Sequence, residues 1–450
     1  MKFLKVALLA ALPLALSQTT SAQGPAAPLT LAEAIAWGVD NNLAVAGQRI
    51  GVEVAARNNN WVTAGRAPVV QATLGVNNSL NSQNNPASFI NGSFYSGDAT
   101  AGLVASYRLF NGYRVRFDRR RLGQLETQAA LQVRQLVEAS VFEVARAYYD
   151  AQLAAAQAGV AAEVLALSAD LVAFRALQRE YGQGRATDVL LARTNYLQDS
   201  VRVEQTAVAT DNALRALYLA MDAADADGFA GRPIADSLLF EPRDWSVERI
   251  ARRIDSSAEV RLLRAQEQLA LTNTELARAA LKPSIDLNAG LSHTRTAFKI
   301  NGENPQTGAP GELVFGSTGR GTVGVQAAYT LWDAGLRRRG VENAIAQERI
   351  SNLAVRNARR DADLRARNLL ATYRTQRQLL ALQDLLIANA EANLALADEQ
   401  LRAGAINSFD YRALQLDYLN AVQARIAAVY DVLVTDLELR RVTGELIEAQ

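Results

Sequence analysis

Residues 113–181 read YRVRFDRRRLGQLETQAALQVRQLVEASVFEVARAYYDAQLAAAQAGVAAEVLALSADLVAFRALQREY, a stretch without proline in which Ala, Leu, Gln, Glu and Arg predominate. These residue types favour helix, and Gly123 and Gly159 are the only weak points. As one helix, the 69 residues would extend for about 100 Å at roughly 1.5 Å per residue. A helix of that length cannot lie inside an ordinary globular domain, so it must span a distance outside one.

The N-terminus has the pattern of a secretory signal peptide. Lys2 and Lys5 precede an apolar run at residues 6–16, and Ser21 and Ala22 offer a cleavage site, which predicts a signal peptide over residues 1–22. Without these two lysines the chain has 45 Lys and Arg against 46 Asp and Glu, so it lacks the basic field that favours nucleic acid as a partner. It also has no cysteine, which excludes disulfides, thiolate metal sites and a lipid anchor on an N-terminal cysteine.

No run of 18 consecutive apolar residues follows the signal peptide. An exported chain of this length is therefore either soluble outside the cytoplasm or crosses a membrane as β-strands. The pattern of the strands has to decide between the two.

The chain contains a duplication. A shift of 215 residues matches Glu33 with Glu248, Ile35 with Ile250, Pro68 with Pro283 and Gly75 with Gly290. After a loop that is 7 residues longer in the second copy, a shift of 222 matches Arg116 with Arg338, Gly182 with Gly404 and Asp188 with Asp410. Both halves are therefore expected to contain the same elements in the same order.

Two segments with a period of two follow each of the matched prolines. Val70, Ala72, Leu74 and Val76 alternate with polar or small residues, and the second half repeats this pattern from Ile285. We predict strands at about 68–78, 100–111, 283–293 and 321–333, with Gly-, Asn- and Ser-rich loops at roughly 78–99 and 293–321. Each strand has an apolar face and a polar face, and the polar face includes Gln71, Arg108, Asp286 and Gln326.

The first predicted repeat spans residues 23–244 and the second spans residues 245–450. Each begins with a helix and two strands, continues with a long helix at 113–181 or 335–403, and turns at a glycine corner into a return helix at 188–221 or 410–446. Residues 222–244 are expected to form an irregular connector because they contain Pro233 and Pro242.

Strands of about ten residues with one apolar face and aromatic residues near their ends fit a transmembrane β-barrel, but a soluble sheet packed on helices shows the same alternation. The signal peptide and the missing apolar helix favour the barrel. Four strands with open edges cannot stand in lipid, so several chains must close the sheet. Two copies would give eight strands around a filled interior, whereas three copies would give twelve strands and an open lumen, which predicts a homotrimer.

With these elements the sequence resembles the outer-membrane efflux protein family, the TolC-like channels. The resemblance covers about residues 29–446 and rests on the order and spacing of repeated motifs: LTLAEAI at 29–35 with Asn41-Asn42, the two prolines, YRLFNG at 107–112, YTLWDAG at 329–335, and the two glycine corners. It implies a mainly α fold with a membrane β-barrel part. Duplicated long-helix hairpins would form a periplasmic α-barrel, and four strands per chain would contribute to a 12-stranded trimeric β-barrel in the cell outer membrane.

The resemblance also implies partners: a periplasmic adaptor (membrane fusion) protein, an inner-membrane pump and outer-membrane lipid. Two positions depart from the family pattern. Members often have Asn-Asn-Pro after the first helix, where this chain has Leu43 in place of the proline. Some members close the periplasmic tip with a Tyr and an Arg, where this chain has Leu401 and Ile406, which argues against a lock of that design.

Asp188 and Asp410 follow the two corners by six residues and are candidate periplasmic gate residues. Threefold symmetry would turn each into a ring of three carboxylates near the tunnel mouth, which attracts cations and repels anions. The alternative is helix capping, because an Asp near a helix N-terminus, beside Thr187 or Ser408, is favoured by the helix dipole.

The corner glycines Gly182, Gly184 and Gly404 are expected to end their helices in a left-handed conformation. The family resemblance adds that the hairpin tips are the docking surface for the adaptor. The docking residues would be Gly182, Gly184, Arg185, Gly404 and Ala405.

Arginines gather at the start of each long helix, where positive charge opposes the helix dipole and calls for an anionic partner. Just below a barrel this partner would be the phospholipid headgroups of the inner leaflet, and the alternative is a solvated charged face. The membrane-proximal basic cluster comprises Arg116, Arg119, Arg120, Arg337 and Arg338.

The sequence shows no catalytic or cofactor-binding constellation, and His293 is the only histidine. We therefore expect no enzyme, no cofactor and no metal. The predicted function is passive export of small molecules, drugs or other toxic compounds, as the exit duct of a tripartite efflux pump. One alternative is the outer-membrane duct of a type I protein secretion system, and another is a periplasmic coiled-coil scaffold without a pore.

Overall fold

A computed structural model describes residues 28–84, 92–223, 232–235, 238–300 and 311–447. The predicted signal peptide at 1–22 lies outside these residues. Within them the elements follow in the order α1 (Leu31–Asn41), α2 (Leu43–Asn58), a π-helical turn η1 (Val62–Arg66), β1 (Val69–Gln83), β2 (Gly92–Phe110), α3 (Arg114–Glu180), α4 (Ala186–Ala220), α5 (Val247–Arg253), η3 (Ile254–Ser256), α6 (Ala258–Ala279), β3 (Ser284–Ile300), β4 (Val314–Ala328), α7 (Leu336–Arg402) and α8 (Ser408–Thr443).

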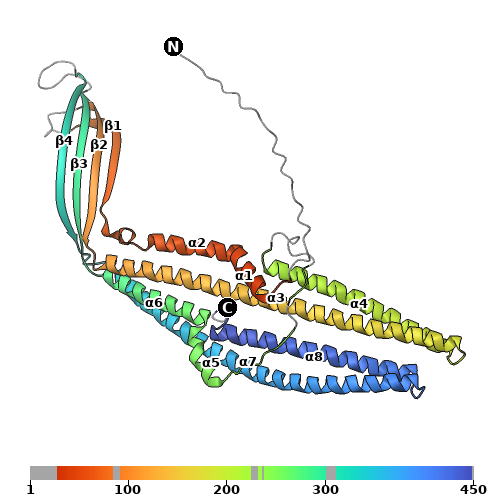
Figure 1. Cartoon of the computed structure of the whole chain (residues 1–450). Helices are drawn as coiled ribbons and strands as arrows, with labels where there is room; N and C mark the ends of the chain where they lie inside the picture. The colour runs from red at the N-terminus through yellow and green to blue at the C-terminus, as the bar shows by residue number, and fades with distance from the viewer. Residues whose placement is uncertain (1–27, 85–91, 224–231, 236–237, 301–310, 448–450) are drawn as a thin grey trace, which may run out of the picture.

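The two long helices set the shape of the molecule. α3 and α7 contain 67 residues each, and both leave one end of the four-stranded sheet and run away from it (Figure 1). α2 and α6 pack along the parts of α3 and α7 nearest the sheet, while α4 and α8 return along the distal parts. The predicted fold, mainly α with duplicated long-helix hairpins and four strands, is confirmed.

The junction between strand and long helix is the same tight turn in both repeats. Gly112 and Tyr113 have φ of 69° and 69°, and Ala334 and Gly335 have φ of 52° and 78°. The Arg114 amide donates to the Asn111 carbonyl at 3.3 Å, and the corresponding Leu336 amide donates to Asp333 at 3.1 Å. Two consecutive left-handed residues closed by such a bond form a type I′ turn. Each turn has one glycine, but at a different one of its two central positions.

The four strands pair antiparallel in the order β1-β2-β3-β4 and are longer than predicted. They contain 15, 19, 17 and 15 residues, because much of the predicted loops at 78–99 and 293–321 continues the ladders. Gly, Asn and Ser do not prevent backbone pairing where both sheet faces can meet water. β4 ends at Ala328 and not near 333, because its last partner is Ser284, and Pro283 before it has no N–H to donate.

Neither repeat opens with one continuous helix. Asn42 ends α1 and caps α2, with its Oδ1 accepting from the Val45 amide at 2.9 Å, so Leu43 occupies the first helical position, where a proline would also fit. In the second repeat a 3₁₀ turn separates α5 from α6, and Ser257 caps α6. The chain therefore makes the break after Asn41 with an asparagine cap alone.

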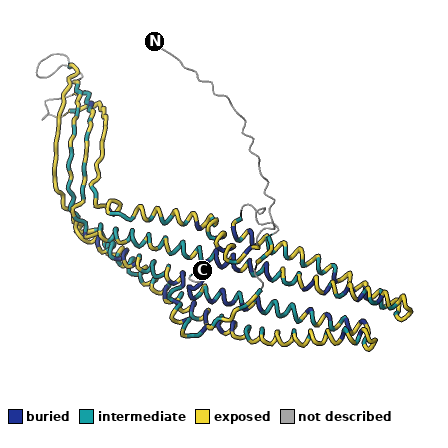
Figure 2. The backbone as a smooth tube through the Cα atoms, viewed as in Figure 1, coloured by how far each residue is buried: buried dark blue, intermediate teal, exposed yellow. Residues whose placement is uncertain are grey.

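The core lies in the middle of the helical part, and the sheet is largely exposed in the single chain (Figure 2). One cluster joins α1, α3, α4 and the end of α8 around the buried Tyr148, whose hydroxyl donates to the Leu29 carbonyl at 2.9 Å. The connector contributes Arg232, whose two guanidinium bonds of 2.9 Å to Glu33 hold the pKa of that carboxyl below its usual value. The N-terminal helix is thereby tied to the described part of the connector.

Candidate functional site

The two faces of the sheet differ in polarity. Arg108 lies opposite Asp286, and Asp286 lies opposite Gln326, so these three polar side chains share one face, on which Arg108 Nε donates to Asp286 Oδ1 at 2.8 Å. Gln71 lies on the same face. The opposite face is apolar and exposed, with Val70, Leu74, Leu103, Leu291, Val323 and Val325.

The sheet has two unpaired edges within the described residues, because β1 pairs only with β2 and β4 pairs only with β3. An open edge with an apolar face beside it exposes peptide groups that lipid cannot hydrogen-bond. A single chain is therefore an incomplete unit if the apolar face meets a membrane.

Both hairpin corners end in the same Schellman motif. Gly182 and Gly404 each have φ of +74°. The amide after each glycine donates to the carbonyl five residues earlier at 2.8 Å, from Gln183 to Gln178 and from Ala405 to Gln400. The duplication thus extends to the individual hydrogen bonds of the two corners.

Gly184 departs from our expectation, because it is not among the left-handed residues. A side chain there would be crowded instead: a Cβ at this position would lie 3.1 Å from the Arg179 amide nitrogen and 3.2 Å from Gln178 Cβ. Arg185 and Ala405 are exposed at the two tips.

Asp188 and Asp410 are equivalent in position, each being the third residue of its helix. Neither is the cap. Asn407 caps α8 by accepting from the Phe409 and Asp410 amides at 2.9 Å, and Arg185 precedes α4 without a side-chain cap. Asp410 is exposed, whereas Asp188 is half-buried near Arg175, whose pKa is lowered mainly by burial, against the opposing field of Asp188. A carboxylate in the first turn still favours the helix dipole.

One ion pair that sequence reasoning missed joins the two hairpins. Arg412 of α8 forms a bidentate pair with Asp199 of α4, with nitrogen–oxygen distances of 2.7 and 2.8 Å, and Ser168 of α3 also bonds to Asp199. The side chains of Arg412 and Asp199 are only 11% and 4% exposed. No local pattern could have indicated a pair so far apart in sequence.

The membrane-proximal basic cluster is only partly neutralised inside the chain. Arg337 pairs with Asp333 at 3.1 Å and Arg338 pairs with Glu342 at 3.2 Å, whereas Arg119 donates to the uncharged Asn59. Arg116 and Arg120 instead lie 5.4 and 5.9 Å from the ring centroids of Tyr113 and Phe117. Some of these arginines therefore have a carboxylate of the same chain as the anionic partner that the sequence predicts, and the others do not.

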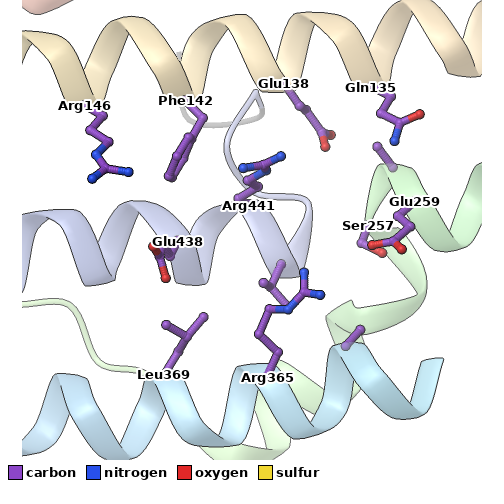
Figure 3. A pocket seen from close by; sticks show the side chains of 13 residues that line it. Gln135, Glu138, Phe142, Arg146, Ser257, Glu259, Arg365, Leu369, Glu438 and Arg441 are labelled. Atoms are coloured by element: carbon purple, nitrogen blue, oxygen red, sulfur yellow. The ribbon is translucent and has the colours of Figure 1, made fainter. Parts of the chain in front are cut away.

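A cavity of about 400 Å³ lies between α3, α6, α7 and α8, at the middle of the helical part (Figure 3). Its charged lining has both signs, with Glu138, Glu259 and Glu438 against Arg146, Arg365 and Arg441. The Arg441 guanidinium lies 4.7 Å from the ring centroid of Phe142. Because the charges balance, the lining indicates packing between helices and not a site for an ion.

Glu138 is the buried carboxyl of this cavity, with 4% exposure. Burial raises its pKa, although the Arg134 guanidinium at 3.3 Å opposes the rise. Because the folded-state pKa lies above the unfolded one, the ionised carboxylate costs stability at neutral pH, and this cost disappears as pH falls through the raised pKa.

Glu138→Gln is therefore expected to stabilise the protein at pH 7 by on the order of 1 kcal/mol, with the gain vanishing at acidic pH. Thermal unfolding followed by circular dichroism between pH 7 and pH 4 measures this. Glu143→Gln, an exposed carboxyl on the same helix, is the matched control and should change little. A gain that persists at acidic pH would contradict the burial argument.

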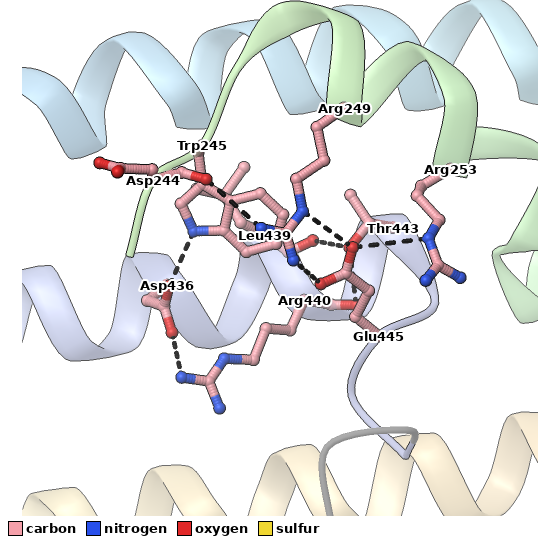
Figure 4. A network of polar contacts seen from close by, with 9 residues as sticks. All are labelled: Asp244, Trp245, Arg249, Arg253, Asp436, Leu439, Arg440, Thr443 and Glu445. Atoms are coloured by element: carbon pink, nitrogen blue, oxygen red, sulfur yellow. Dashed lines mark hydrogen bonds and ion pairs between the residues drawn. The ribbon is translucent and has the colours of Figure 1, made fainter. Parts of the chain in front are cut away.

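A polar network holds the connector and α5 to the end of α8 (Figure 4). Trp245 Nε1 donates to Asp436 at 2.8 Å, and Asp436 also pairs with Arg440 at 2.5 Å. Arg249 bonds to the buried Glu445 at 2.6 Å, and this bond is the main cause of the raised pKa of Arg249. The network therefore holds the connector and α5 against the end of α8.

Among the described residues, no group of three or more potential metal-ligating side chains occurs. Of the helices that the structure describes, α7 alone contains a segment long and apolar enough to cross a membrane by length and composition, and that segment is not buried in the chain.

The model of the family described as outer membrane efflux protein matches residues 251–445. No curated protein matches the chain. Residues 251–445 are thus similar to this family, and the described part of the chain has the fold of the TolC-like channels.

Several solved channels share this fold along nearly the whole chain. The CmeC outer-membrane channel of Campylobacter jejuni is 15% identical, with coverage of 92% of this chain and 85% of that chain and a TM-score of 0.74. The outer-membrane protein VceC of Vibrio cholerae is 14% identical, with coverage of 92% and 96% and a TM-score of 0.73. The open state of the MtrE outer-membrane channel of Neisseria gonorrhoeae is 16% identical, with coverage of 92% and 89% and a TM-score of 0.69.

Proposed function

We propose that three copies of the chain close a 12-stranded β-barrel and a helical tunnel, and that this trimer is a passive exit duct for small molecules. The observation that supports the proposal is that β1 and β4 each leave one edge of the sheet unpaired. β4 of one copy would pair with β1 of the next, which satisfies both edges and turns the polar face, with Gln71, Arg108, Asp286 and Gln326, toward the lumen. Twelve strands leave room for a lumen, whereas eight are filled by their side chains.

The helical part also has faces that another copy would cover. On α4, Leu190, Leu197 and Val208 are about 60% exposed, and on α7, Leu382 and Leu385 are 56% and 64% exposed. Apolar side chains exposed in rows along α4 and α7, one helix from each hairpin, favour burial between subunits. The apolar segment of α7 is explained in this way without a membrane-spanning helix.

Acidic side chains near the tips favour cations over anions. A cavity of about 470 Å³ between α3, α7 and α8 is lined by Glu163, Asp170, Glu391 and Asp398, and by the aromatic residues Phe174, Tyr411 and Tyr418. Arg402 also lines it and pairs with Asp398 at 2.8 Å, so the carboxylates outnumber the positive charge. Burial is the main cause of the raised pKa of Tyr418, and the negative field of Glu163 and Glu391 adds to it. In the trimer these carboxylates and the ring of Asp410 would form a negative approach to the mouth.

Energy would come from a partner pump, because the sequence has no nucleotide-binding motif. The tips, with Gly182, Gly184, Arg185, Gly404 and Ala405, would be the docking surface for a periplasmic adaptor. The hydrogen-bonded Schellman corners support this role, since a docking tip needs a defined backbone conformation.

The decisive experiment is planar-bilayer conductance of the purified, assembled protein together with its mass in detergent. The proposal expects a trimer with stable single-channel currents and restored drug resistance in an efflux-deficient host that supplies the partner pump. A trimer without conductance would favour the scaffold. Conductance with no change in resistance but export of a polypeptide would favour the secretion duct.

Asp410→Ala is expected to raise single-channel conductance by removing a ring of three exposed carboxylates that restricts the closed tip. Asp417→Ala is the matched control, because Asp417 is an exposed carboxyl two turns further along α8. Equal conductance of Asp410→Ala and the wild-type trimer would exclude Asp410 as a gate.

A further inference from the structure

Tyr113 occupies a backbone position that favours glycine. The equivalent residue of the second repeat is Gly335, and both have a left-handed φ, 69° for Tyr113 and 78° for Gly335. A tyrosine in this conformation is strained, whereas glycine is not. Since the same turn forms with glycine in the other repeat, the tyrosine side chain must have a use that the turn itself does not explain.

The ring of Tyr113 holds two positive charges. Lys282 Nζ lies 5.0 Å from its centroid and the Arg116 guanidinium carbon lies 5.4 Å from it, while Phe110 contacts the ring edge-on at 5.4 Å. Both cations are exposed, and Tyr113 is 48% exposed. Two like charges on one ring repel each other unless an anion lies between them.

No carboxylate of the described residues pairs with either cation. The neighbouring arginines differ in this respect: Arg114 and Arg121 pair with Asp118 at 3.4 and 3.2 Å, and Arg338, the equivalent of Arg116, pairs with Glu342 at 3.2 Å. Arg116 and Lys282 therefore bring two positive charges without a carboxylate partner to the strained tyrosine, and Arg120 adds a third about one turn further along α3.

The site lies where the apolar face of the sheet ends. Phe110 is opposite Ile285 after the bulge in β2, and Ile285 is in line with Leu287 and Leu291 on the apolar face. Lys282 precedes β3 by two residues and follows α6 by three. A lipid whose acyl chains cover the apolar face would have its phosphate at the level of Tyr113, Arg116 and Lys282.

We propose that Tyr113, Arg116 and Lys282 form a binding site for the phosphate of an anionic phospholipid in the periplasmic leaflet of the outer membrane. The guanidinium fork of Arg116 matches two phosphate oxygens, Lys282 supplies a second positive charge, and the tyrosine hydroxyl can donate to a third oxygen. Phe110 and Ile285 lie beside the glycerol and the first carbons of the chains. The inference rests on the proposed β-barrel standing in an outer membrane and not on what the channel exports.

The test measures lipid binding to the purified full chain in detergent by native mass spectrometry, with phosphatidylglycerol, phosphatidylethanolamine and inorganic phosphate as separate probes. Arg116→Gln with Lys282→Gln is expected to weaken phosphatidylglycerol binding about tenfold. The control, Arg338→Gln with Arg339→Gln, removes the same charge from the second repeat and is expected to weaken it less than twofold. Equal losses in both double variants would show a non-specific basic surface and overturn the site.

Tyr113→Gly tests whether the tyrosine ring contributes to lipid binding independently of its effect on folding. It relieves the left-handed strain, so the protein is expected to fold at least as stably, yet phosphatidylglycerol binding should fall severalfold while conductance stays unchanged. Wild-type affinity in this variant would remove the tyrosine from the site. Competition by inorganic phosphate at millimolar concentration, or equal affinity for phosphatidylethanolamine, would overturn the assignment to an anionic lipid.

Discussion

Arg412→Ala is expected to destabilise the helical part by about 3–5 kcal/mol, because it leaves the carboxylate of Asp199 buried without its partner. Asp199 is 4% exposed and accepts two bonds from Arg412, at 2.7 and 2.8 Å, and one from Ser168. The pair links α8 to α4 and α3, so the loss falls on the contact between the hairpins and not on the hairpins themselves. The expected result is a lower midpoint of thermal unfolding, followed by circular dichroism, with little loss of helix content before unfolding.

Arg425→Ala is the matched control for this effect. Arg425 forms an equally short pair, 2.6 Å from Asp384, but both side chains are about half exposed. Exposed pairs contribute roughly 0–1 kcal/mol, so this variant should remain close to the wild type. Arg412→Met combined with Asp199→Leu should recover much of the lost stability, since it removes both charges at once. If Arg412→Ala unfolds at the same temperature as Arg425→Ala, the buried pair does not hold the hairpins together.

Gly112→Ala is expected to cost roughly 3 kcal/mol or more, the sum of left-handed strain and overpacking. Gly112 has φ of +69°, and a Cβ there would lie 2.5 Å from the Ala279 carbonyl oxygen and 2.8 Å from Lys282 Cβ. The carbonyl belongs to the last turn of α6 and cannot move without shifting the start of β3. The fraction of folded, membrane-inserted protein should fall accordingly, as judged by heat-modifiable migration on gels.

Ala334→Gly provides the comparison within the same chain. Ala334 is the repeat equivalent of Gly112 and has φ of +52°, so glycine there relieves strain and is expected to be neutral or stabilising by about 1 kcal/mol. The duplication alone would suggest that alanine is tolerated at position 112, because the equivalent residue of the second repeat, Ala334, is an alanine. Wild-type folding of Gly112→Ala would mean that α6 can move away from the turn.

Much of the fold could be predicted from the sequence, because the two-residue period of the strands, the helix-favouring composition of the long stretches and the internal duplication determine it. The change from a period of two to a long proline-free stretch located the strands and the long helices, and the 222-residue shift placed the two corners on equivalent residues. The ends of the strands could not be predicted, because backbone pairing continues through Asn77–Gln83 whatever the side chains are. The helix breaks at Asn42 and Ser257 depend on single capping bonds inside otherwise helical patterns.

The candidate site was harder to predict because it depends on contacts between distant segments. The first-turn positions of Asp188 and Asp410 followed from the spacing, but the cap of α8 is Asn407, whose signal, an asparagine directly before the helix, was available in the sequence. The pairing of Arg412 with Asp199 and of Lys282 with Tyr113 depends on how separate helices and turns pack, which no local pattern encodes.

The ion pair between the hairpins has a geometric consequence for any partner. Asp199 lies 13 residues after Ala186, where α4 begins, whereas Arg412 lies only 4 residues after Ser408, where α8 begins. At about 1.5 Å per residue, this offset places the tip of α3 and α4 roughly 13 Å beyond the tip of α7 and α8. Figure 1 shows that the tip of α3 and α4 reaches further from the sheet. In a trimer the periplasmic rim would have six hairpin tips, three of which extend further than the other three. A ring-shaped adaptor with six identical binding sites would meet tips at two different heights. A partner that fits all six tips would therefore need two kinds of binding site in alternation around the axis.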